Sequence, residues 1–470
     1  MRKILSILIL VLTAMSAHAQ QEALPVVRLT GTFGNDYQAG TFELIDDTTT
    51  ITMDANIKWR GGTTNAPDKH KRNYKIKLPV DTTLLGMRHD DSWILDAGQA
   101  DPFRLRNLIA MELWNDMSRR PYYIDKQPEA RNGFSGRVVE VYLNDEYQGI
   151  YNLMENIDRK QMKLKKVLNG QVRGCLYKVK HYGYGNMNDT VDIYDNHSDT
   201  WEYIEAKYPD LNDNDTTDWS TLYNALNFVT FSSDEEFAAH VDEYFDIPVV
   251  IDISIFIGII GGLDNRGKNI LWAVYDKTKD KKLTPVPWDL DCSIGQYWIE
   301  EKFRGPEILF DWQIGLTTRL CKDNVNGFND SLNARYKELR QGVLATDSVT
   351  GRYRRYYELL KRTGAAEREQ QRWSGDSDIS GREINFDQEI DSITTWITSH
   401  LEWIDQAWYP LDAWTEWWES QQETAMQAPQ RPFNRQTNTF YTLTGQRVQN
   451  AQKPRPGIYI RNGRKVIIRF

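Results

Sequence analysis

The sequence predicts an α+β protein with a β-rich N-terminal part and a mainly helical C-terminal part. Residues 26–78 alternate in polarity and carry Gly, Asn and Asp at intervals, which is typical of strands joined by turns. Further along the chain, the segments 331–344, 351–362 and 385–408 are typical of helices. A chain of 470 residues is long enough for two or three domains and a sizeable core.

The N-terminus has the pattern of a signal peptide. Arg2 and Lys3 precede an apolar run at 4–12, and the small-residue site Ala17-His18-Ala19 follows it. We therefore expect residues 1–19 to be removed and the protein to be exported. No later apolar run reaches the ~18 residues that a transmembrane helix needs, so no transmembrane segment is expected.

Composition excludes some classes of function. A net charge of −9 argues against nucleic-acid binding, which depends on clustered Lys and Arg. Three cysteines do not make a disulfide framework. Cys292 lies beside Asp291, but no His is near it in sequence, so we interpret it as a small buried residue. The 16 tryptophans favour core packing, with a groove that binds ligands as the alternative.

The segment 101–117 predicts an amphipathic helix with Asp101 as its N-cap and Pro102 at its first position. Arg104 and Arg106 would lie in the first turns, where the helix dipole disfavours cations. Their position therefore predicts partners elsewhere in the fold.

The middle of the chain predicts mixed elements. Two strands around the turn at 144–146 form a hairpin, and residues 176–180 add a strand. Residues rich in Asp, Asn and Thr at 186–218 resemble the opening of a calcium-binding loop, but Asp215 stands where that loop needs Gly. We interpret this stretch as a surface insertion. Three helices are expected after it, the last of them apolar and buried; they span 220–231, 234–244 and 246–260.

A second hairpin, within residues 261–295, gathers acidic side chains. Its apolar runs, 269–275 and 283–286, flank a charged turn. Asp264 precedes the first run, and Asp289 and Asp291 follow the second. A hairpin brings its ends together, so these carboxylates should converge, and converging carboxylates repel unless a cation lies between them. Oxygen ligands favour a hard ion such as Mg2+.

The spacing within this hairpin agrees with phosphoryl transfer. Protein kinases place a catalytic Asp five residues before a metal-binding Asn, followed by a short hairpin and a second metal-binding Asp. Asp264 and Asn269 have that spacing, and Asp289 follows the hairpin.

Over residues 56–408 the chain resembles the CotH kinases, secreted or spore-coat proteins with an atypical protein-kinase fold. The motifs that carry the resemblance in the first half are Trp59-Arg60-Gly61, Tyr74-Lys75-Ile76-Lys77-Leu78, Leu85-Gly86-Met87, Trp93-Ile94-Leu95, Asp101, Leu105-Arg106-Asn107, Val141-Tyr142-Leu143-Asn144, Gly149-Ile150-Tyr151 and Glu155. The most specific motifs are Asp264-Asn265-Arg266-Gly267-Lys268-Asn269 and Pro287-Trp288-Asp289-Leu290-Asp291.

The resemblance implies a two-lobed kinase-like fold and transfer of the ATP γ-phosphate to Ser or Thr of a protein. The implied divisions are a β-rich N-lobe, an insertion with helices, and a C-lobe with the catalytic hairpin, at 26–180, 181–245 and 246–425. Asp264 would be the catalytic Asp, and Mg2+ or Mn2+ would be held by Asn269, Asp289 and Asp291. For Asp291 a turn-capping role is the alternative.

The resemblance also implies a nucleotide pocket. Lys75, Lys77 and Lys178 are the candidates for the cation on the ATP phosphates, and the sequence does not choose between them. Lys75 and Lys77 share one face of a strand. The alternative to phosphate binding is that this face is simply exposed to solvent. Arg60 and Glu155 are expected in the pocket, with a buried ion pair between them as the alternative.

The C-terminal tail resembles another known element. A Gln/Pro/Arg-rich linker at 426–440 precedes short strands at 441–470. Their Gly and Val spacing is similar to that of the sorting domains of proteins exported by the type IX secretion system. This implies a secreted or cell-surface protein that engages that machinery.

Two other functions remain open at this stage. The first is a catalytically silent, kinase-like module for surface binding or adhesion. The second is a glycan-binding surface protein that uses the tryptophans between 396 and 418, although packing of a helix is favoured for them.

Overall fold

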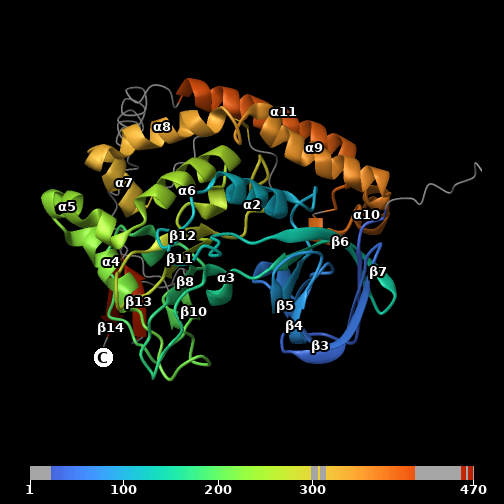
Figure 1. The fold of residues 1–470 in the computed structure, drawn as a ribbon, viewed down its shortest axis with the longest axis horizontal. Coiled ribbons are helices and arrows are strands. Elements are labelled where there is room, and N and C mark those ends of the chain that lie inside the picture. Colours follow the sequence, from blue (N-terminus) through green and yellow to red (C-terminus); the bar gives the residue numbers. More distant parts are fainter. Residues whose placement is uncertain are drawn as a thin grey trace, which may run out of the picture. The chain divides into compact units, whose positions relative to one another are not determined.

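The fold was analysed in a computed structural model, which describes residues 23–297, 305–306, 314–379, 381–407, 457–461 and 464–468 (Figure 1). The chain divides into two compact units, Met1–Gln406 and Ala407–Phe470. The first unit has a β-rich N-terminal region and a helical C-terminal part, which confirms the predicted α+β class.

The N-terminal region is a closed barrel with strand order β1-β2-β3-β4-β5-β7-β6. Its strands are β1 (Val26–Thr30), β2 (Gln38–Ile45), β3 (Thr50–Arg60), β4 (Asn73–Thr83), β5 (His89–Asp96), β6 (Gly136–Leu143) and β7 (Glu146–Glu155). Neighbouring strands are antiparallel except β1 and β6, whose parallel pairing closes the barrel. The hairpin predicted around residues 144–146 is β6–β7.

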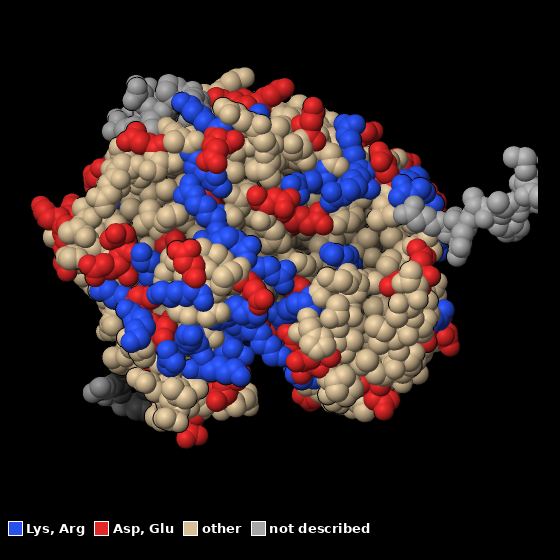
Figure 2. All heavy atoms as spheres, viewed as in Figure 1, with Lys and Arg blue, Asp and Glu red and all other residues tan. Residues whose placement is uncertain are grey.

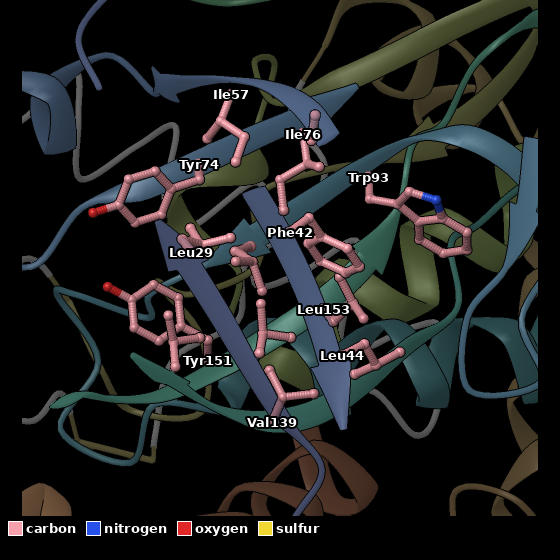
Figure 3. Close-up of a cluster of buried hydrophobic side chains, with 14 of the residues drawn as sticks. Leu29, Phe42, Leu44, Ile57, Tyr74, Ile76, Trp93, Val139, Tyr151 and Leu153 are labelled. Atoms are coloured by element: carbon pink, nitrogen blue, oxygen red, sulfur yellow. The ribbon is translucent and has the colours of Figure 1, made fainter. Parts of the chain in front are cut away.

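Apolar side chains fill the barrel, as Figure 3 shows. On β3 and β4, Ile57, Tyr74 and Ile76 are almost fully buried in this core. Because side chains alternate along a strand, the lysines next to them face outward. Lys58 pairs in register with Lys75 on that outer face.

A second sheet, with strand order β12-β11-β8-β10-β9, carries the central hairpin. Its strands are β8 (Cys175–Val179), β9 (Thr200–Trp201), β10 (Ile204–Tyr208), β11 (Ile270–Val274) and β12 (Thr284–Pro287). The predicted strand at 176–180 is therefore the central strand of this sheet. The stretch predicted as a surface insertion supplies two of its strands, β9 and β10.

Helices make up most of the remainder of the first unit. They are α2 (Arg106–Met117), α3 (Arg159–Met162), α4 (Ser220–Phe231), α5 (Asp234–Tyr244), α6 (Ile247–Ile260), α7 (Gly315–Lys322), α8 (Phe328–Arg340), α9 (Thr346–Arg362), α10 (Ala365–Trp373) and α11 (Phe386–Ala407). In Figure 1, α2 and α6 lie over the second sheet, and α8, α9 and α11 lie beyond them. Trp114 of α2 packs on Phe256 of α6 with ring centroids 5.3 Å apart.

Several predicted helices match the structure closely. The helices predicted at 220–231 and 234–244 are α4 and α5 at the same bounds, and the apolar helix at 246–260 is the buried α6. In α11, Trp396 is buried and stacks on His400, so this tryptophan packs in the core. The tryptophans from residue 408 onward lie outside the described residues.

The helix predicted at 101–117 begins later than expected, at Arg106. Arg104 has a positive φ of 66°, which ends the preceding turn and prevents a helix from starting at Asp101. Asp101 instead accepts hydrogen bonds from the backbone N–H groups of Phe103 (2.9 Å) and Arg106 (2.8 Å).

The two arginines have the distant partners that were predicted. Arg104 Nε lies 2.7 Å from Glu369 Oε1, and Arg106 pairs with Asp101 and with Glu389. Cys175 and Cys292 are buried thiols, and burial raises the pKa of Cys175 to about 12.

The second unit is described only at β13 (Gly457–Arg461) and β14 (Arg464–Ile468), which form an antiparallel pair. The predicted signal peptide, linker and remaining tail lie outside the described residues. None of the helices in the described part of the chain has the length and apolarity that crossing a membrane would require.

Candidate active site

The central hairpin brings its two ends together, as predicted. Ile270 pairs with Pro287 at the open end of β11 and β12, and the backbone N–H of Trp288 donates to Asn269 O at 2.9 Å. The fully buried Asn265 donates from its side chain to Trp288 O at 2.8 Å. The residues before β11 and after β12 are therefore fixed relative to each other.

Asp264 and Asn269 are in direct contact. Asn269 Nδ2 donates to Asp264 Oδ2 at 2.9 Å, and Lys268 Nζ lies 2.7 Å from Asp264 Oδ1. The hydrogen bond and the charge of Asp264 outweigh burial and raise the pKa of Lys268. Because Nδ2 of Asn269 donates to Asp264, Oδ1 of Asn269 is the atom that could bind a metal ion. Asn269 and Asp289 both have a positive φ, of 54° and 60°, a backbone conformation that residues other than Gly seldom adopt.

Asp289 and Asp291 lie in strongly acidic surroundings. Asp289 is exposed to solvent, and Asp291 is half-buried. Enclosure by protein raises the pKa of Asp289, and repulsion from Asp96 and Asp264 raises it further. The pKa of Asp291 is also raised, first by burial and then by repulsion from Asp289.

This set of ligands fits a hard divalent cation. Mg2+ in nucleotide sites is commonly bound by one or two carboxylates together with phosphates and water. Asn269, Asp289 and Asp291 offer one amide oxygen and two carboxylates, and the mutual repulsion of the carboxylates is what a cation would relieve. In the described residues, the groups of three His, Cys, Asp or Glu side chains whose ligand atoms lie within 4.8 Å of one another are found elsewhere.

Two cations from different sheets flank the site on the ring of Trp288. Lys178 of β8 places Nζ 4.9 Å from the ring centroid, and Arg60 at the end of β3 places Cζ 5.3 Å from it. Burial, and then the charge of Arg60, lower the pKa of Lys178 to about 8. Burial also lowers the pKa of Arg60, against the opposing charges of Asp96 and Asp289.

More basic residues continue from this pair across the outer face of the barrel. Burial, followed by repulsion from Lys207, Arg60 and Lys58, lowers the pKa of Lys75 to about 8. Figure 2 shows Lys and Arg side chains gathered in a hollow on this face of the molecule. We call the following set the basic cleft: Lys58, Arg60, Lys75, Lys178 and Lys207.

Two predicted pocket residues form ion pairs with other side chains. Lys77 is exposed and lies 2.6 Å from Asp91, although it shares a strand face with Lys75. Glu155 is fully buried and pairs with Arg131 at 2.7 Å, so the alternative of an ion pair with Arg60 is wrong. The Glu155 carboxylate also accepts from the backbone N–H groups of residues 88 and 135 at 2.9 and 3.0 Å.

Sequence reasoning assigned no role to three residues that the structure places at the site. Asn107 Nδ2 donates to Asp96 Oδ2 at 2.8 Å, and Asn107 Oδ1 accepts from the backbone N–H of Leu290 at 3.1 Å. These contacts connect β5 and α2 to the end of the hairpin. Lys268 is the third residue. Asn107 and Lys268 belong to motifs that carry the CotH resemblance. Asp96 only follows such a motif, and nothing else in the sequence indicated a role for it.

Comparison with known proteins identifies a family for the chain. A model of the family described as CotH kinase protein matches residues 57–404. The chain belongs to the CotH kinase family. A search of curated proteins found no match. The CotH region contains every predicted site residue, from Arg60 to Asp291, and starts inside β3, so the first two barrel strands precede it.

Proposed function

We propose that this CotH chain is a Mg2+-dependent protein kinase that transfers the γ-phosphate of ATP to Ser or Thr of a protein. The observation that carries the proposal is the 2.9 Å contact between Asp264 and Asn269, with Asp289 at the other end of the same hairpin. Phosphoryl transfer depends mainly on positioning and charge stabilisation, and this arrangement supplies both.

In this proposal Asp264 orients the acceptor hydroxyl and receives its proton. The acceptor oxygen forms a bond to the γ-phosphorus while the bond from that phosphorus to the β–γ bridging oxygen breaks, and ADP leaves. Lys268, 2.7 Å from Asp264, would add positive charge beside the transferred group.

The remaining residues would hold the nucleotide. Asn269, Asp289 and Asp291 would hold Mg2+ or Mn2+, which when bound supplies positive charge to the phosphate oxygens. Arg60 and Lys178 lie close enough to Asp289 for its charge to act on both, and so they suit the phosphates beside a metal. Lys75 lies one step farther out in the basic cleft.

Calorimetry and phosphate transfer together test this assignment. We expect Mg2+-dependent ATP binding by the wild type, loss of that binding in Asp289→Ala, and retention of it in Asp264→Asn. Transfer of labelled phosphate to a Ser/Thr-rich protein should be lost in both variants, whereas the control Asp91→Asn, outside the hairpin, should keep it. Binding that survives in Asp289→Ala, or transfer that survives in Asp264→Asn, would contradict the assigned roles.

We also propose that the protein acts outside the cytoplasm, because of the signal-peptide pattern at 1–19 and the sorting-like tail at 441–470. Mass spectrometry of the protein from its native cells should find an N-terminus at Gln20 and, after type IX export, a chain without the tail. A full-length chain confined to the cytoplasm would refute this proposal.

A further inference from the structure

A second group of metal-ligand side chains lies where the segment before β4 meets the turn after α10. His70, Asp376 and Asp378 each offer one ligand atom, and these atoms all lie within 4.8 Å of one another. His70 Nδ1 is 2.9 and 3.1 Å from the two carboxylate oxygens of Asp376. These residues are about 300 positions apart in sequence, so only the tertiary fold brings them together.

Asp378 supplies independent evidence for a ligand. Its side chain is 97% buried, with only 3% of its surface exposed. Its Oδ2 accepts from the backbone N–H groups of His70 at 2.7 Å and Lys71 at 2.9 Å. Its Oδ1 is buried and has no hydrogen-bond partner. An ionised carboxylate oxygen enclosed in this way is unfavourable unless a cation meets it.

Among its own three members, the cluster also has more acidic than basic groups. Two carboxylates face one imidazole, and in the described part of the chain neither Asp376 nor Asp378 forms an ion pair with Lys or Arg. The other close acidic group, which consists of Asp81, Asp90 and Asp91, differs from this cluster. There Lys160 Nζ lies 3.5, 3.0 and 3.7 Å from the three carboxylates, so a protein cation already occupies the centre.

We propose that His70, Asp376 and Asp378 bind a divalent transition metal, with Zn2+ as the best chemical match. One imidazole nitrogen and two carboxylate oxygens are a common ligand set for Zn2+, whereas Mg2+ and Ca2+ prefer oxygen alone. Ligands of tetrahedral Zn2+ stand about 3.3 Å apart, close to the contacts between His70 and Asp376. The His70 side chain is 54% exposed, which leaves room for water as a fourth ligand.

The position of the site indicates its effect. His70 precedes Lys71, a buried lysine whose Nζ lies 2.9 Å from Glu369 of α10, and Asp376 follows that helix closely. A bound ion would therefore join the connection between α10 and α11 to the start of β4. This strand carries Lys75 in the basic cleft, so the ion would stabilise one wall of the cleft. The proposal is independent of the proposed kinase activity.

Calorimetric titration of the full chain with ZnCl2 tests the site, in the presence of excess Mg2+ to occupy oxygen-ligand sites. We expect one Zn2+ per chain in the wild type. Loss of a second-shell partner alone typically weakens Zn2+ binding 10- to 100-fold, so His70→Ala and Asp378→Asn should weaken it by at least about 100-fold. His197→Ala is the matched control, because His197 lies 3.2 Å from Asp195 on the surface without a third ligand nearby.

Two further measurements keep the test decisive. Zn2+ should raise the melting temperature of the wild type and of His197→Ala but not that of His70→Ala, which separates lost binding from misfolding. Should the variants fail to fold, X-ray absorption of the Zn2+-loaded wild type should show one imidazole nitrogen and oxygen ligands without sulfur. Absence of Zn2+ binding in the wild type, unchanged binding in His70→Ala, or a sulfur ligand would each overturn the proposal.

Discussion

The structure ranks the three lysines that the sequence left equivalent, and the ranking predicts their effects on nucleotide binding. Lys178 lies 4.9 Å from the Trp288 ring centroid, and its charge acts on Asp289 more strongly than that of Arg60. Lys75 belongs to the basic cleft but interacts mainly with other cations. Lys77 is turned to Asp91 at 2.6 Å. We therefore expect Lys178 to contribute most, Lys75 less and Lys77 nothing measurable.

The expected losses of binding free energy follow from how far each lysine is buried. Lys178 is partly buried, so its hydrogen bonds to phosphate should be worth about 1.5–3 kcal/mol, the range for bonds to charged groups. Lys178→Met should then raise the Kd for Mg-ATP roughly 10- to 150-fold. Lys75 acts from farther away in a more screened position, so Lys75→Met should cost about 0.5–1 kcal/mol, or roughly two- to fivefold.

Calorimetry with Mg-ATP on the three Lys→Met variants measures this order directly. Met keeps the length of the aliphatic stem and can still pack on Trp288, so the comparison isolates the charge. Lys77→Met is the internal control, because it removes the same charge from the same strand as Lys75. The reasoning fails if Lys77→Met weakens binding as much as Lys178→Met, or if Lys178→Met leaves the Kd unchanged.

Two further predictions concern pH and stability. Burial and neighbouring cations lower the pKa values of Lys178 and Lys75 to about 8, so both are mostly protonated at pH 7 and lose their charge as the pH rises through 8. Mg-ATP binding should therefore weaken between pH 7 and 9 and take up protons near pH 8, which calorimetry in buffers of different ionisation enthalpy detects. The proton uptake should fall most in Lys178→Met and less in Lys75→Met, and an uptake unchanged in both variants would contradict this. Glu369→Ala leaves the buried cations Lys71 and Arg104 without their carboxylate, at 2.9 and 2.7 Å, and should lower the free energy of unfolding in urea by about 3–5 kcal/mol. Glu146→Ala, which breaks an exposed ion pair, should cost less than about 1 kcal/mol, and equal losses in the two variants would refute the argument.

Features that depend on local sequence were predictable. The helices α4 and α5 match their predicted bounds because each ends within a few residues of a polar or turn-forming stretch, and Ser233 caps α5 through the backbone N–H of Glu236. The contact between Asp264 and Asn269 is local, since they are five residues apart before β11, and the hairpin then joins this segment to the residues after β12. Five-residue spacing and strand pairing are properties of one short segment.

Features that depend on distant segments were not predictable in the same way. Nothing near Lys77 in sequence shows that Asp91, on the neighbouring strand, will take its charge. The start of α2 moved because Arg104 adopts a positive φ while its side chain reaches Glu369, 265 residues away. Likewise, residues 200–208 are polar enough to be interpreted as a surface loop. They form strands only because β10 pairs with β8 and β9 pairs with β10.

The pairing of β8 explains how the site acquires its cations. Lys178 lies opposite Leu271 of the hairpin on one side and Glu205 of β10 on the other, so its place is fixed by both neighbours. Arg60 arrives from the barrel and meets the same Trp288 ring. Two cations so close together repel, but both lie over the same aromatic ring, whose π-system attracts positive charge. The residue preceding Asp289 thus holds two positive charges beside an acidic centre, which is the charge distribution that binding a metal–triphosphate complex requires.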